Sequence, residues 1–490
     1  MGLAVRTGLR LRSDPTRVVS RLFVPGQELV GGSESRAANT VERILALSDA
    51  DVEEALRDLF SRFDSRHDDL AGVFEQHSQR VADYVTGSLS PQRRQLLGAA
   101  FTHEYSLEGA AICNPSLVAH PDQTDVAAGG RRIVLSYRAI GEGHRSSICF
   151  RTGVIDVAGG LVLDDQQPFP VTGEITSASL DRQLFHALLG DLGLDGETAA
   201  SVLVNLADQF SPLALEAAVA RLSTQSDIRL NVIETAGLLR LIAVSFYTAR
   251  FDESTELSRR VLWPSTPNEV QGVEDARFVE FDGEGVATYL ASYTAYNGRT
   301  VSQQLLETDD FVTFKSSPLA GRGARNKGLA IFPRQIAGRY VALSRHDRES
   351  NAIAFSSDLH RWDDVTTSQL PLQAWEILQL GNCGSPIELA EGWLVITHGV
   401  GPMRTYGIGA TLLDLDDPRR VIAHLPRPLL VPDADEQDGY VPNVVYSCGS
   451  MLHDDTLYLP YGVADQSIGC AMVDVPSLLE AFEPVEATAA

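Results

Sequence analysis

Polar side chains of the kinds that transfer protons and bind anions recur beside strand-like runs of the sequence. The adjacent carboxylates Glu274 and Asp275 stand just before Arg277. Further candidates lie beside other such runs: Asn114, Arg138, Lys327, Arg345, His398 and Asp465. A carboxylic acid can donate a proton to a leaving oxygen, and arginine or lysine can hold a phosphate group. If the fold brings these residues together, they predict an acid beside a local cationic site that suits phosphate.

A recurring unit explains how residues so distant in sequence could meet. Apolar strands end in a small polar or aromatic triplet, in the copies LASYTA (290–295), VALSRH (341–346), VITHGV (395–400) and YLPYGV (458–463), with an earlier relative in VLSYRA (134–139). From Tyr293 to Ser344, Thr397 and Tyr461 the successive steps are 51, 53 and 64 residues. Periods of roughly 40–60 residues with several short strands indicate propeller blades, which converge on one axis. Equivalent positions would then line one funnel: Arg138, Thr294, Arg345, His398 and Gly462.

The pattern of apolar residues changes along the chain. Residues 1–35 show no regular period and are expected to be irregular, whereas 40–105 have the 3.6-residue period of helices. From residue 110, short β-branched and aromatic runs alternate with Gly, Asp and Pro turns, apart from a helical insertion at about 181–243. We expect a mainly β protein with a largely helical N-terminal extension (1–109), a β-propeller catalytic domain (110–478) and a C-terminal tail (479–490). The strand around Tyr247 also resembles the repeat, so the repeats alone allow five or six blades.

The composition narrows the possible partners and the compartment. The 490 residues include 40 Lys and Arg against 65 Asp and Glu, a formal net charge of −25. Such a chain repels nucleic acid and anionic lipid, so neither is an expected partner. The five cysteines are scattered and form no Cys-x-x-Cys pair, and the N-terminal segment lacks the apolar core of a secretory signal. A cytoplasmic location without a membrane span is the resulting expectation.

Common catalytic motifs are missing or incomplete. His103-Glu104 lacks the second histidine of a zinc-protease helix, and the glycine-rich run 321–328 lacks the Gly-Lys-Ser/Thr of a P-loop. No Gly-x-Ser-x-Gly nucleophile elbow occurs. These observations argue against a metalloprotease, a nucleotide hydrolase and a serine hydrolase, and we expect no metal site and no cofactor.

The polar segments, read in order, resemble glycoside hydrolase family 130. The matching pieces are Asn-Pro and Tyr-Arg (114–115, 137–138), Gly-x-Glu-Asp-x-Arg (272–277), Asn-Lys-Gly (326–328), Ser-Arg (344–345), Thr-His-Gly-Val (397–400), LLDLDDP (412–418) and Tyr-Gly-x-Ala-Asp (461–465). The resemblance covers roughly residues 110–475. It implies a five-bladed propeller and, for most members, inverting phosphorolysis of β-mannosides to α-mannose 1-phosphate, with some β-1,2-mannosidases. Ala276 stands where the common pattern has proline, and Gly328 where it has aspartate.

The resemblance also implies roles for single residues. Asp275 matches the general acid, which acts through a sugar hydroxyl as a proton relay. Asn114, Arg138 and Asp465 match groups around the sugar whose bond is cut. The positions that match the basic set around phosphate are Arg277, Lys327, Arg345 and His398. Inorganic phosphate is therefore the implied co-substrate, and the N-terminal helices are implied to assist oligomerisation or to close the substrate site.

The two reaction types differ in the carboxylates that they need. Inverting hydrolysis requires a second carboxylate, roughly 6.5–9.5 Å from the acid, to activate water, whereas phosphate is already a competent nucleophile. On a regular strand Glu274 would point away from Asp275, which disfavours it as that second group, while Glu142 and Glu388 stay open. The favoured interpretation is phosphorolysis of β-1,2-manno-oligosaccharides. The alternatives are a β-1,2-mannosidase and a non-catalytic, glycan-binding propeller.

Overall fold

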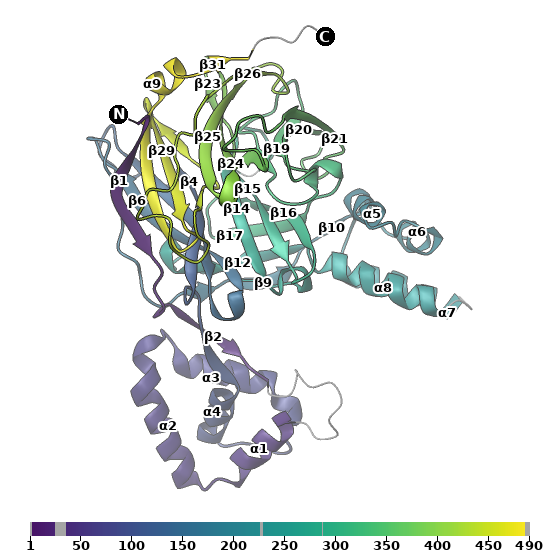
Figure 1. Cartoon of the computed structure of the whole chain (residues 1–490). Helices are drawn as coiled ribbons and strands as arrows, with labels where there is room; N and C mark the ends of the chain where they lie inside the picture. Colours follow the sequence, from purple (N-terminus) through teal and green to yellow (C-terminus); the bar gives the residue numbers. More distant parts are fainter. Residues whose placement is uncertain (1, 25–35, 226–228, 287, 486–490) are drawn as a thin grey trace. The chain divides into compact units, whose positions relative to one another are not determined.

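The computed structural model of the chain describes residues 2–24, 36–225, 229–286 and 288–485 (Figure 1). It separates into two compact units. The larger unit comprises Met1–Ser13, Ala110–Gln166 and Thr172–Ala490, and the smaller one Asp14–Gly109 and Gln167–Val171. Strands predominate in the larger unit, which confirms the mainly β expectation.

The smaller unit is built from four helices and one pair of strands. The helices are α1 (Arg36–Ala46), α2 (Asp49–Phe63), α3 (Leu70–Arg80) and α4 (Pro91–Ala100), and the antiparallel strands are β2 (Val18–Leu22) and β3 (Thr102–Ser106). Ser48 and Asp51 form a capping box that begins α2, and Ser90 with Pro91 begins α4. The apolar faces of these helices pack on one another around the buried Val41, Val52 and Phe101. The helix caps and the buried apolar faces therefore both support the helices that the sequence pattern predicts in this unit.

His77 lies on the apolar face of α3 and packs inside the small unit. Its Nδ1 lies 2.7 Å from the Thr102 hydroxyl. Burial, together with the neighbouring Arg21 and Arg80 cations, lowers the pKa of His77 to about 4. A neutral histidine with a local hydrogen bond is a packing residue, as its place on an apolar stripe predicts.

The strands of the larger unit form antiparallel groups. In chain order, the first contains β4 (Ala111–Ala119), β5 (Arg131–Ile140), β6 (Ser146–Ile155) and β7 (Leu161–Leu163), and the second β14 (Gly272–Glu280), β15 (Tyr289–Tyr296), β16 (Val301–Thr308) and β17 (Thr313–Pro318). The third contains β18 (Ala330–Ile331), β19 (Tyr340–Ser344), β20 (Asn351–Ser356) and β21 (Asp364–Gln369). The fourth contains β22 (Gln379–Asn382), β23 (Ile387–Leu389), β24 (Gly392–Val400), β25 (Tyr406–Leu413), β26 (Val421–His424) and β31 (Glu483–Pro484). The fifth contains β27 (Val445–Tyr446), β28 (Met451–His453), β29 (Thr456–Val463), β30 (Ser467–Asp474) and β1 (Ala4–Arg12).

The N-terminal strand β1 corrects the expectation that residues 1–35 are irregular. It pairs antiparallel with β30, from Ala4 opposite Val473 to Arg12 opposite Ser467, and completes the fifth group (Figure 1). β2 also lies in this stretch, whereas residues 25–35 are outside the described residues. Residues 4–12 alternate arginine with small and apolar residues, so they lack the β-branched run that marks a strand. Pairing with a distant partner, and not local propensity, makes β1 a strand.

Neighbouring groups are joined by backbone hydrogen bonds or bridges. Gly272 of β14 pairs parallel with Ser146 of β6, which links the first and second groups into one sheet. The first and last groups also meet, because the Ile112 amide donates to the Gln466 carbonyl (3.4 Å) and the Cys448 amide to the Pro115 carbonyl (2.8 Å). Two further strands, β12 (Tyr247–Arg250) and β9 (Glu174–Ser177), extend the second group beyond β17, and β13 (Arg260–Leu262) pairs with β6.

Aromatic residues fill the spaces between the groups. Phe314 and Trp362 are both buried, and each lies four residues after an aspartate that fixes a turn, Asp310 and Asp358. The Asp310 carboxylate accepts hydrogen bonds from the amides of residues 312 and 313, and the Asp358 carboxylate accepts them from residues 360 and 361. The repeated aspartate–aromatic spacing of the sequence thus marks equivalent turns in the second and third groups.

The helical insertion forms its own core beside the second group. It contains α5 (Arg182–Asp191), α6 (Glu197–Leu203), α7 (Pro212–Gln225) and α8 (Arg229–Ala243) (Figure 1). The short strand β10 (Leu180–Asp181) precedes α5 and pairs with β11 (Gln209–Phe210), which lies between α6 and α7. Phe185, Leu239 and Phe246 are buried in this core, which also includes Ala320 from the segment after β17. The Asp191 carboxylate accepts a hydrogen bond of 2.6 Å from the Gly321 amide. A last helix, α9 (Val475–Glu480), follows β30.

No helix among the described residues has both the length and the apolar character that a membrane crossing would need.

Candidate active site

A β-bulge in β14 aims both neighbouring carboxylates at one site. Glu274 pairs with Thr294, but the next paired residue is Arg277, opposite Ser292, so the register shifts between them. Asp275 lies inside the bulge with φ of 59°. The sequence-based prediction that Glu274 points away from Asp275 is therefore wrong, because alternation of side chains holds only where the ladder is regular.

A second bulge faces the first and holds Asn114. The register of β4 against β5 shifts between Cys113 and Ser116, and Asn114 has φ of 52°. Its side-chain amide donates a hydrogen bond to the Asp275 carboxylate. Both side chains are buried, with Asp275 only 7% exposed. Two non-glycine residues in left-handed conformations thus meet at one point, which is a feature of functional sites.

Asp275 is the electrostatic centre of the cluster. Burial by itself would raise the pKa of the Asp275 carboxyl group, but Lys327, Arg277 and Arg138 oppose it, and the Asn114 hydrogen bond adds to their effect. The net result is a pKa below the usual range of aspartate. Asp275 is therefore ionised near neutral pH when no substrate is bound.

Glu274 connects two of these cations. Its Oε1 accepts a hydrogen bond of 2.6 Å from the Arg138 guanidinium, and its Oε2 lies 2.5 Å from the Lys327 ammonium. The Glu274 side chain is 6% exposed, against 41% for Lys327. A buried carboxylate of this kind costs free energy unless it is paired, and here both of its oxygens are engaged. Glu274 therefore positions Arg138 and Lys327.

Arg277 ties three strand groups together behind Asp275. It is almost fully buried, and its guanidinium donates to the Asp275 backbone carbonyl (2.8 Å), the Tyr446 hydroxyl (2.7 Å) and the Asn382 side-chain oxygen (3.3 Å). Asn382 in turn donates to the Gly328 carbonyl (2.7 Å). This network fixes the position of the Arg277 charge. The sequence did not predict Tyr446 as a site residue.

Two glycines show how closely Arg345 approaches the other site residues. A Cβ on Gly328, where φ is +90°, would lie 3.7 Å from Arg345 Nη1 and 3.8 Å from Arg277 Nη2. A Cβ on Gly381 would lie 2.4 Å from His398 Cε1 and 2.6 Å from Arg345 Cδ. The two guanidinium groups and the histidine ring are thus packed around bare backbone, which leaves no room for larger residues.

His398 belongs to the cluster but is neutral. Its Nδ1 lies 3.0 Å from the Asn382 carbonyl, which can only accept, so Nδ1 carries the proton. Its Nε2 then accepts a hydrogen bond of 3.2 Å from the Gln379 amide. Burial, followed by the Arg345 and Arg277 cations, lowers the pKa of His398 well below its ordinary value. His398 therefore offers hydrogen bonding and not charge, and Gln379 is a site residue that the sequence did not reveal.

Asp465 completes the group from the turn between β29 and β30. Burial raises the pKa of Asp465 to about 6, although Arg138 opposes the rise, and the Asp275 and Glu274 carboxylates add to it. The same fold region therefore holds an aspartate with a lowered pKa and one with a raised pKa. Opposite shifts of neighbouring carboxyl groups are typical of sites that move protons.

The sequence left two further carboxylates open, Glu142 and Glu388. Glu142 is exposed in the turn between β5 and β6. Glu388 forms an ion pair with Arg334 (2.5 Å) at the surface, where both side chains are partly exposed. Among the described residues, no group of three or more His, Cys, Asp or Glu side chains is placed to hold a metal ion. The cluster itself offers carboxyl groups, guanidinium and ammonium cations and amides.

Comparison with known proteins identifies the family. The profile described as β-1,4-mannooligosaccharide phosphorylase matches residues 248–483. A 1,2-β-oligomannan phosphorylase of Thermoanaerobacter sp. is 36% identical over 233 residues, which cover 45% of this chain and 75% of that protein. A β-1,2-mannobiose phosphorylase of the same organism is 36% identical over 218 residues, 44% of this chain and 70% of that protein. A solved structure of β-1,2-mannobiose phosphorylase from Listeria innocua with β-1,2-mannobiose has a TM-score of 0.46 and 21% identity, and covers 77% of this chain and 92% of that chain.

The chain belongs to glycoside hydrolase family 130. Its enzyme class is that of the glycoside phosphorylases.

Proposed function

We propose that this enzyme cleaves β-mannosides by inverting phosphorolysis and releases α-mannose 1-phosphate. The observation that carries the proposal is the meeting of one acid, Asp275, with the cations of Arg277, Lys327 and Arg345 in a protein of net charge −25. Fixed cations in a largely buried site can hold a phosphate in line for attack and stabilise the charge of the transition state.

The proposed reaction uses Asp275 as the general acid. A phosphate oxygen attacks the anomeric carbon, and the bond from that carbon to the glycosidic oxygen breaks. The bonding electrons pass to the leaving oxygen, which receives a proton that originates at Asp275 and travels through a sugar hydroxyl. Asp275 must be protonated to start this step, so the low pKa of the ligand-free site has to rise. A bound phosphate does this by neutralising the cations that now hold the Asp275 pKa low.

The other site residues divide between the two substrates. The residues proposed to hold the mannosyl unit are Asn114, Arg138 and Asp465. They come from β4, β5 and the β29–β30 turn. The residues proposed to hold phosphate are Arg277, Lys327, Arg345 and His398. His398 contributes by orienting the Gln379 amide, which donates to its Nε2. The Glu274 bridge between Arg138 and Lys327 supports this division, because it spans the proposed boundary.

The substrate class is proposed from the relatives. Two proteins of Thermoanaerobacter sp. and one of Listeria innocua are named phosphorylases of 1,2-β-oligomannan or β-1,2-mannobiose, with 34–36% identity. A β-1,4-mannooligosaccharide phosphorylase of Ruminococcus albus is 32% identical over a shorter stretch, 185 residues. We therefore propose β-1,2-linked manno-oligosaccharides as substrates.

The fold proposed for this function is a five-bladed propeller spanning residues 110–478, interrupted by the helices at 181–243 and preceded by the extension at 1–109. Five strand groups in chain order, hydrogen bonds between the first and last of them, and site residues drawn from each group support it. The strand β1 is then the outer strand of the last blade.

A hydrolytic function is the second candidate, and Glu274 is the observation in its favour. The bulge aims Glu274 into the site, so a second carboxylate does stand near Asp275. Each of its oxygens already accepts from a cation, Arg138 or Lys327, however, so a water would have to compete with these contacts or use the remaining lone pairs.

Cleavage of β-1,2-mannobiose with and without inorganic phosphate separates the two functions. Phosphorolysis predicts that mannose release and disaccharide loss both require phosphate and saturate with it. Release of free mannose at an equal rate without phosphate would overturn the proposal and support hydrolysis.

A further inference from the structure

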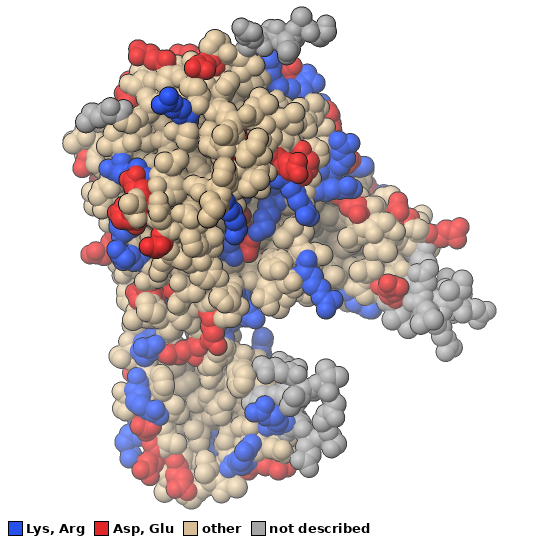
Figure 2. Space-filling view, in the orientation of Figure 1, with Lys and Arg blue, Asp and Glu red and all other residues tan. Residues whose placement is uncertain are grey.

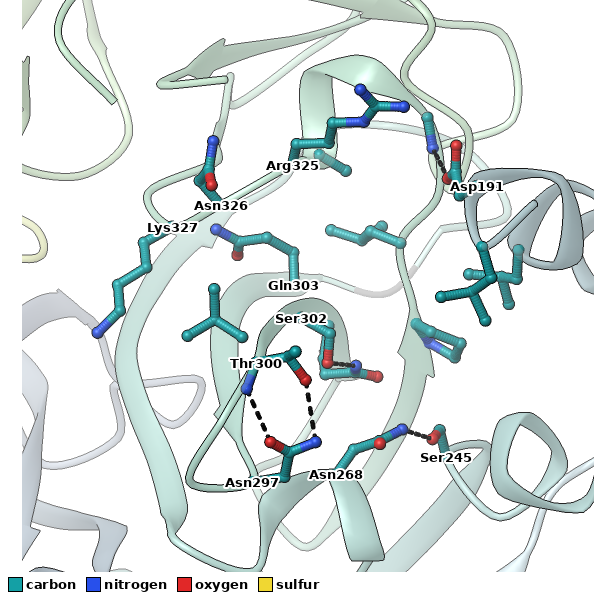
Figure 3. A pocket seen from close by; sticks show the side chains of 18 of the residues that line it. Asp191, Ser245, Asn268, Asn297, Thr300, Ser302, Gln303, Arg325, Asn326 and Lys327 are labelled. Carbon is teal, nitrogen blue, oxygen red and sulfur yellow. Dashed lines mark hydrogen bonds between the residues drawn. The ribbon is translucent and has the colours of Figure 1, made fainter. Parts of the chain in front are cut away.

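A large cavity opens beside the proposed phosphate residues and is walled by the helical insertion (Figure 3). Its volume is about 910 Å³, within the size range of pockets that bind small molecules. Lys327, Arg345 and Gln379 line one part of it, whereas the sugar-side residues Asn114 and Asp465 do not. The cavity is thus continuous with the phosphate side of the site and not with the mannosyl side.

The cavity has an apolar wall opposite a basic one. α5, α8 and the segment after β17 contribute the apolar side chains Leu188, Leu192, Leu238, Leu241, Ile242 and Leu319. Leu192 is 56% exposed. Arg325 and Arg348 add to the charge of Lys327 and Arg345 on the other side. On the face shown in Figure 2, basic side chains gather where the strand groups meet the helical insertion.

Three buried polar atoms at the cavity lack hydrogen-bond partners among the described residues. They are Nε2 of Gln303 and Oε1 of Gln304, both residues 2% exposed, and Nε of Arg345. Figure 3 shows the Gln303 side chain extending into the cavity between Lys327 and Asp191. Buried polar atoms of this kind are normally satisfied. The Gln303 and Arg345 donors therefore point to a ligand that accepts hydrogen bonds here, and the Gln304 oxygen points to one that also donates.

We infer that this cavity binds a phosphate monoester, with the phosphate at Lys327 and Arg345 and an apolar substituent against α5 and α8. The inference rests on the proposed function for the position of the phosphate. Charge complementarity selects the anionic head. The rest of the lining includes the polar residues Asn268, Asn297, Thr300, Ser302, Gln303 and Gln304, but the leucine side chains of α5 and α8 offer no hydrogen-bond partner and favour an apolar substituent on that wall. Such a monoester occupies the phosphate position and competes with inorganic phosphate.

The test compares inhibition of phosphate-dependent cleavage of β-1,2-mannobiose by methyl, butyl and hexyl phosphate and by mannose 6-phosphate, using the full chain. Each methylene that is fully buried strengthens binding about fourfold. We expect competition with inorganic phosphate, and an inhibition constant at least about tenfold lower for hexyl than for methyl phosphate, since the cavity wall covers part of the chain. Mannose 6-phosphate should bind no better than methyl phosphate.

Substitutions in the apolar wall of the cavity test whether that wall causes the tighter binding of hexyl phosphate. Leu241→Ser and Leu238→Ser should each reduce the advantage of hexyl over methyl phosphate while leaving the KM for inorganic phosphate unchanged. Leu213→Ser is the matched control, because Leu213 is on α7 of the same insertion, is 80% exposed and does not line the cavity. Melting temperatures of all three variants show whether the insertion stays folded, and the methyl phosphate constant serves as an internal reference for each.

Equal inhibition by methyl and hexyl phosphate, or tighter binding of mannose 6-phosphate than of hexyl phosphate, would overturn the inference while the proposed function stands. An enzyme whose cleavage is indifferent to inorganic phosphate would instead overturn the proposed function. Hexyl phosphate binding to that enzyme, measured by titration calorimetry on the wild type and Leu241→Ser, would then decide the inference separately.

Discussion

Glu274 Oε2 lies 2.5 Å from Lys327 Nζ, across the boundary between the second and third strand groups. The same carboxylate holds Arg138 at 2.6 Å through its other oxygen. One buried acid therefore restrains a cation proposed to bind phosphate and a cation proposed to bind sugar. Phosphate has to compete with Glu274 for Lys327, so the ion pair sets both the position and the availability of that charge.

Glu274→Gln should separate these two effects. With the negative charge removed, Lys327 is free to donate to phosphate, and we expect the KM for phosphate to fall about two- to fivefold, the range for partly exposed ion pairs. The KM for mannoside should rise because Arg138 loses its partner. Initial rates over a grid of both substrate concentrations measure the two constants.

The same variant distinguishes the two reaction types. If Glu274 activated water, Glu274→Gln would abolish cleavage altogether. Retention of phosphate-dependent turnover in this variant agrees with a positioning role, whereas complete loss of turnover in a protein of normal melting temperature contradicts it.

Arg345→Met should weaken phosphate binding specifically. The Arg345 Nε has no hydrogen-bond partner among the described residues, so its removal leaves no existing bond broken there. A hydrogen bond to a charged group contributes about 1.5–3 kcal/mol, so we expect the KM for phosphate to rise about 10- to 100-fold. The measurement is kcat and KM at varied phosphate with saturating β-1,2-mannobiose. Arg322→Met, at an exposed arginine, is the control, and equal effects of the two substitutions would refute the assignment.

Gly381→Ala should displace two proposed phosphate residues with one methyl group. The added Cβ would lie 2.4 Å from His398 Cε1 and 2.6 Å from Arg345 Cδ, closer than real contacts allow. Because small misplacements of a positioned group are costly, we expect kcat/KM for phosphate to fall about 100-fold. Gly237→Ala is the control, since a Cβ there meets nothing within 4 Å. Full activity of Gly381→Ala would mean that neither side chain is needed where it lies.

Asp465→Asn should change how stability depends on pH. The folded-state pKa of Asp465 is raised from 3.8 to about 6, so the folded protein holds this proton more tightly than the unfolded chain. That contribution to stability is complete below the unfolded pKa and is lost as the pH rises through about 6. Asparagine cannot titrate. The melting temperature of Asp465→Asn minus that of wild type should therefore increase between pH 4 and pH 7.

Thermal unfolding of both proteins without ligand, at half-unit steps of pH, measures this difference. Asp282→Asn, at an exposed position, corrects for the general effect of an amide. A difference between Asp465→Asn and wild type that is the same at every pH would show that Asp465 titrates normally.

The repeat in the sequence located the strands nearest to the site. Tyr293, Ser344, Thr397 and Tyr461 lie in β15, β19, β24 and β29, one in each of four successive groups. Strand periodicity and turn residues are local properties, so they are visible without a structure. The helices of the smaller unit are also predictable from the sequence, because their capping residues and apolar faces are local sequence patterns.

The sequence did not predict the features that depend on contacts between residues far apart along the chain. The direction of Glu274 follows from a bulge that only the pairing of β14 with β15 defines. Strand β1 exists because β30 offers it an edge, and Tyr446 joins the site through a bond to Arg277, 169 residues away. None of these features has a local signature, and the resemblance to a family supplied residue roles but not these supporting contacts.

Phosphorus NMR of the reaction of β-1,2-mannobiose with inorganic phosphate tests the central claim, with wild type and Asp275→Asn compared at equal concentration. The account predicts that the first product of wild type is the α-anomer of mannose 1-phosphate. It also predicts that Asp275→Asn forms this product about 100- to 10,000-fold more slowly, the usual contribution of a general acid, while its melting temperature is maintained. Free mannose formed without phosphate, the β-anomer as first product, or an Asp275→Asn variant as fast as wild type would contradict the account.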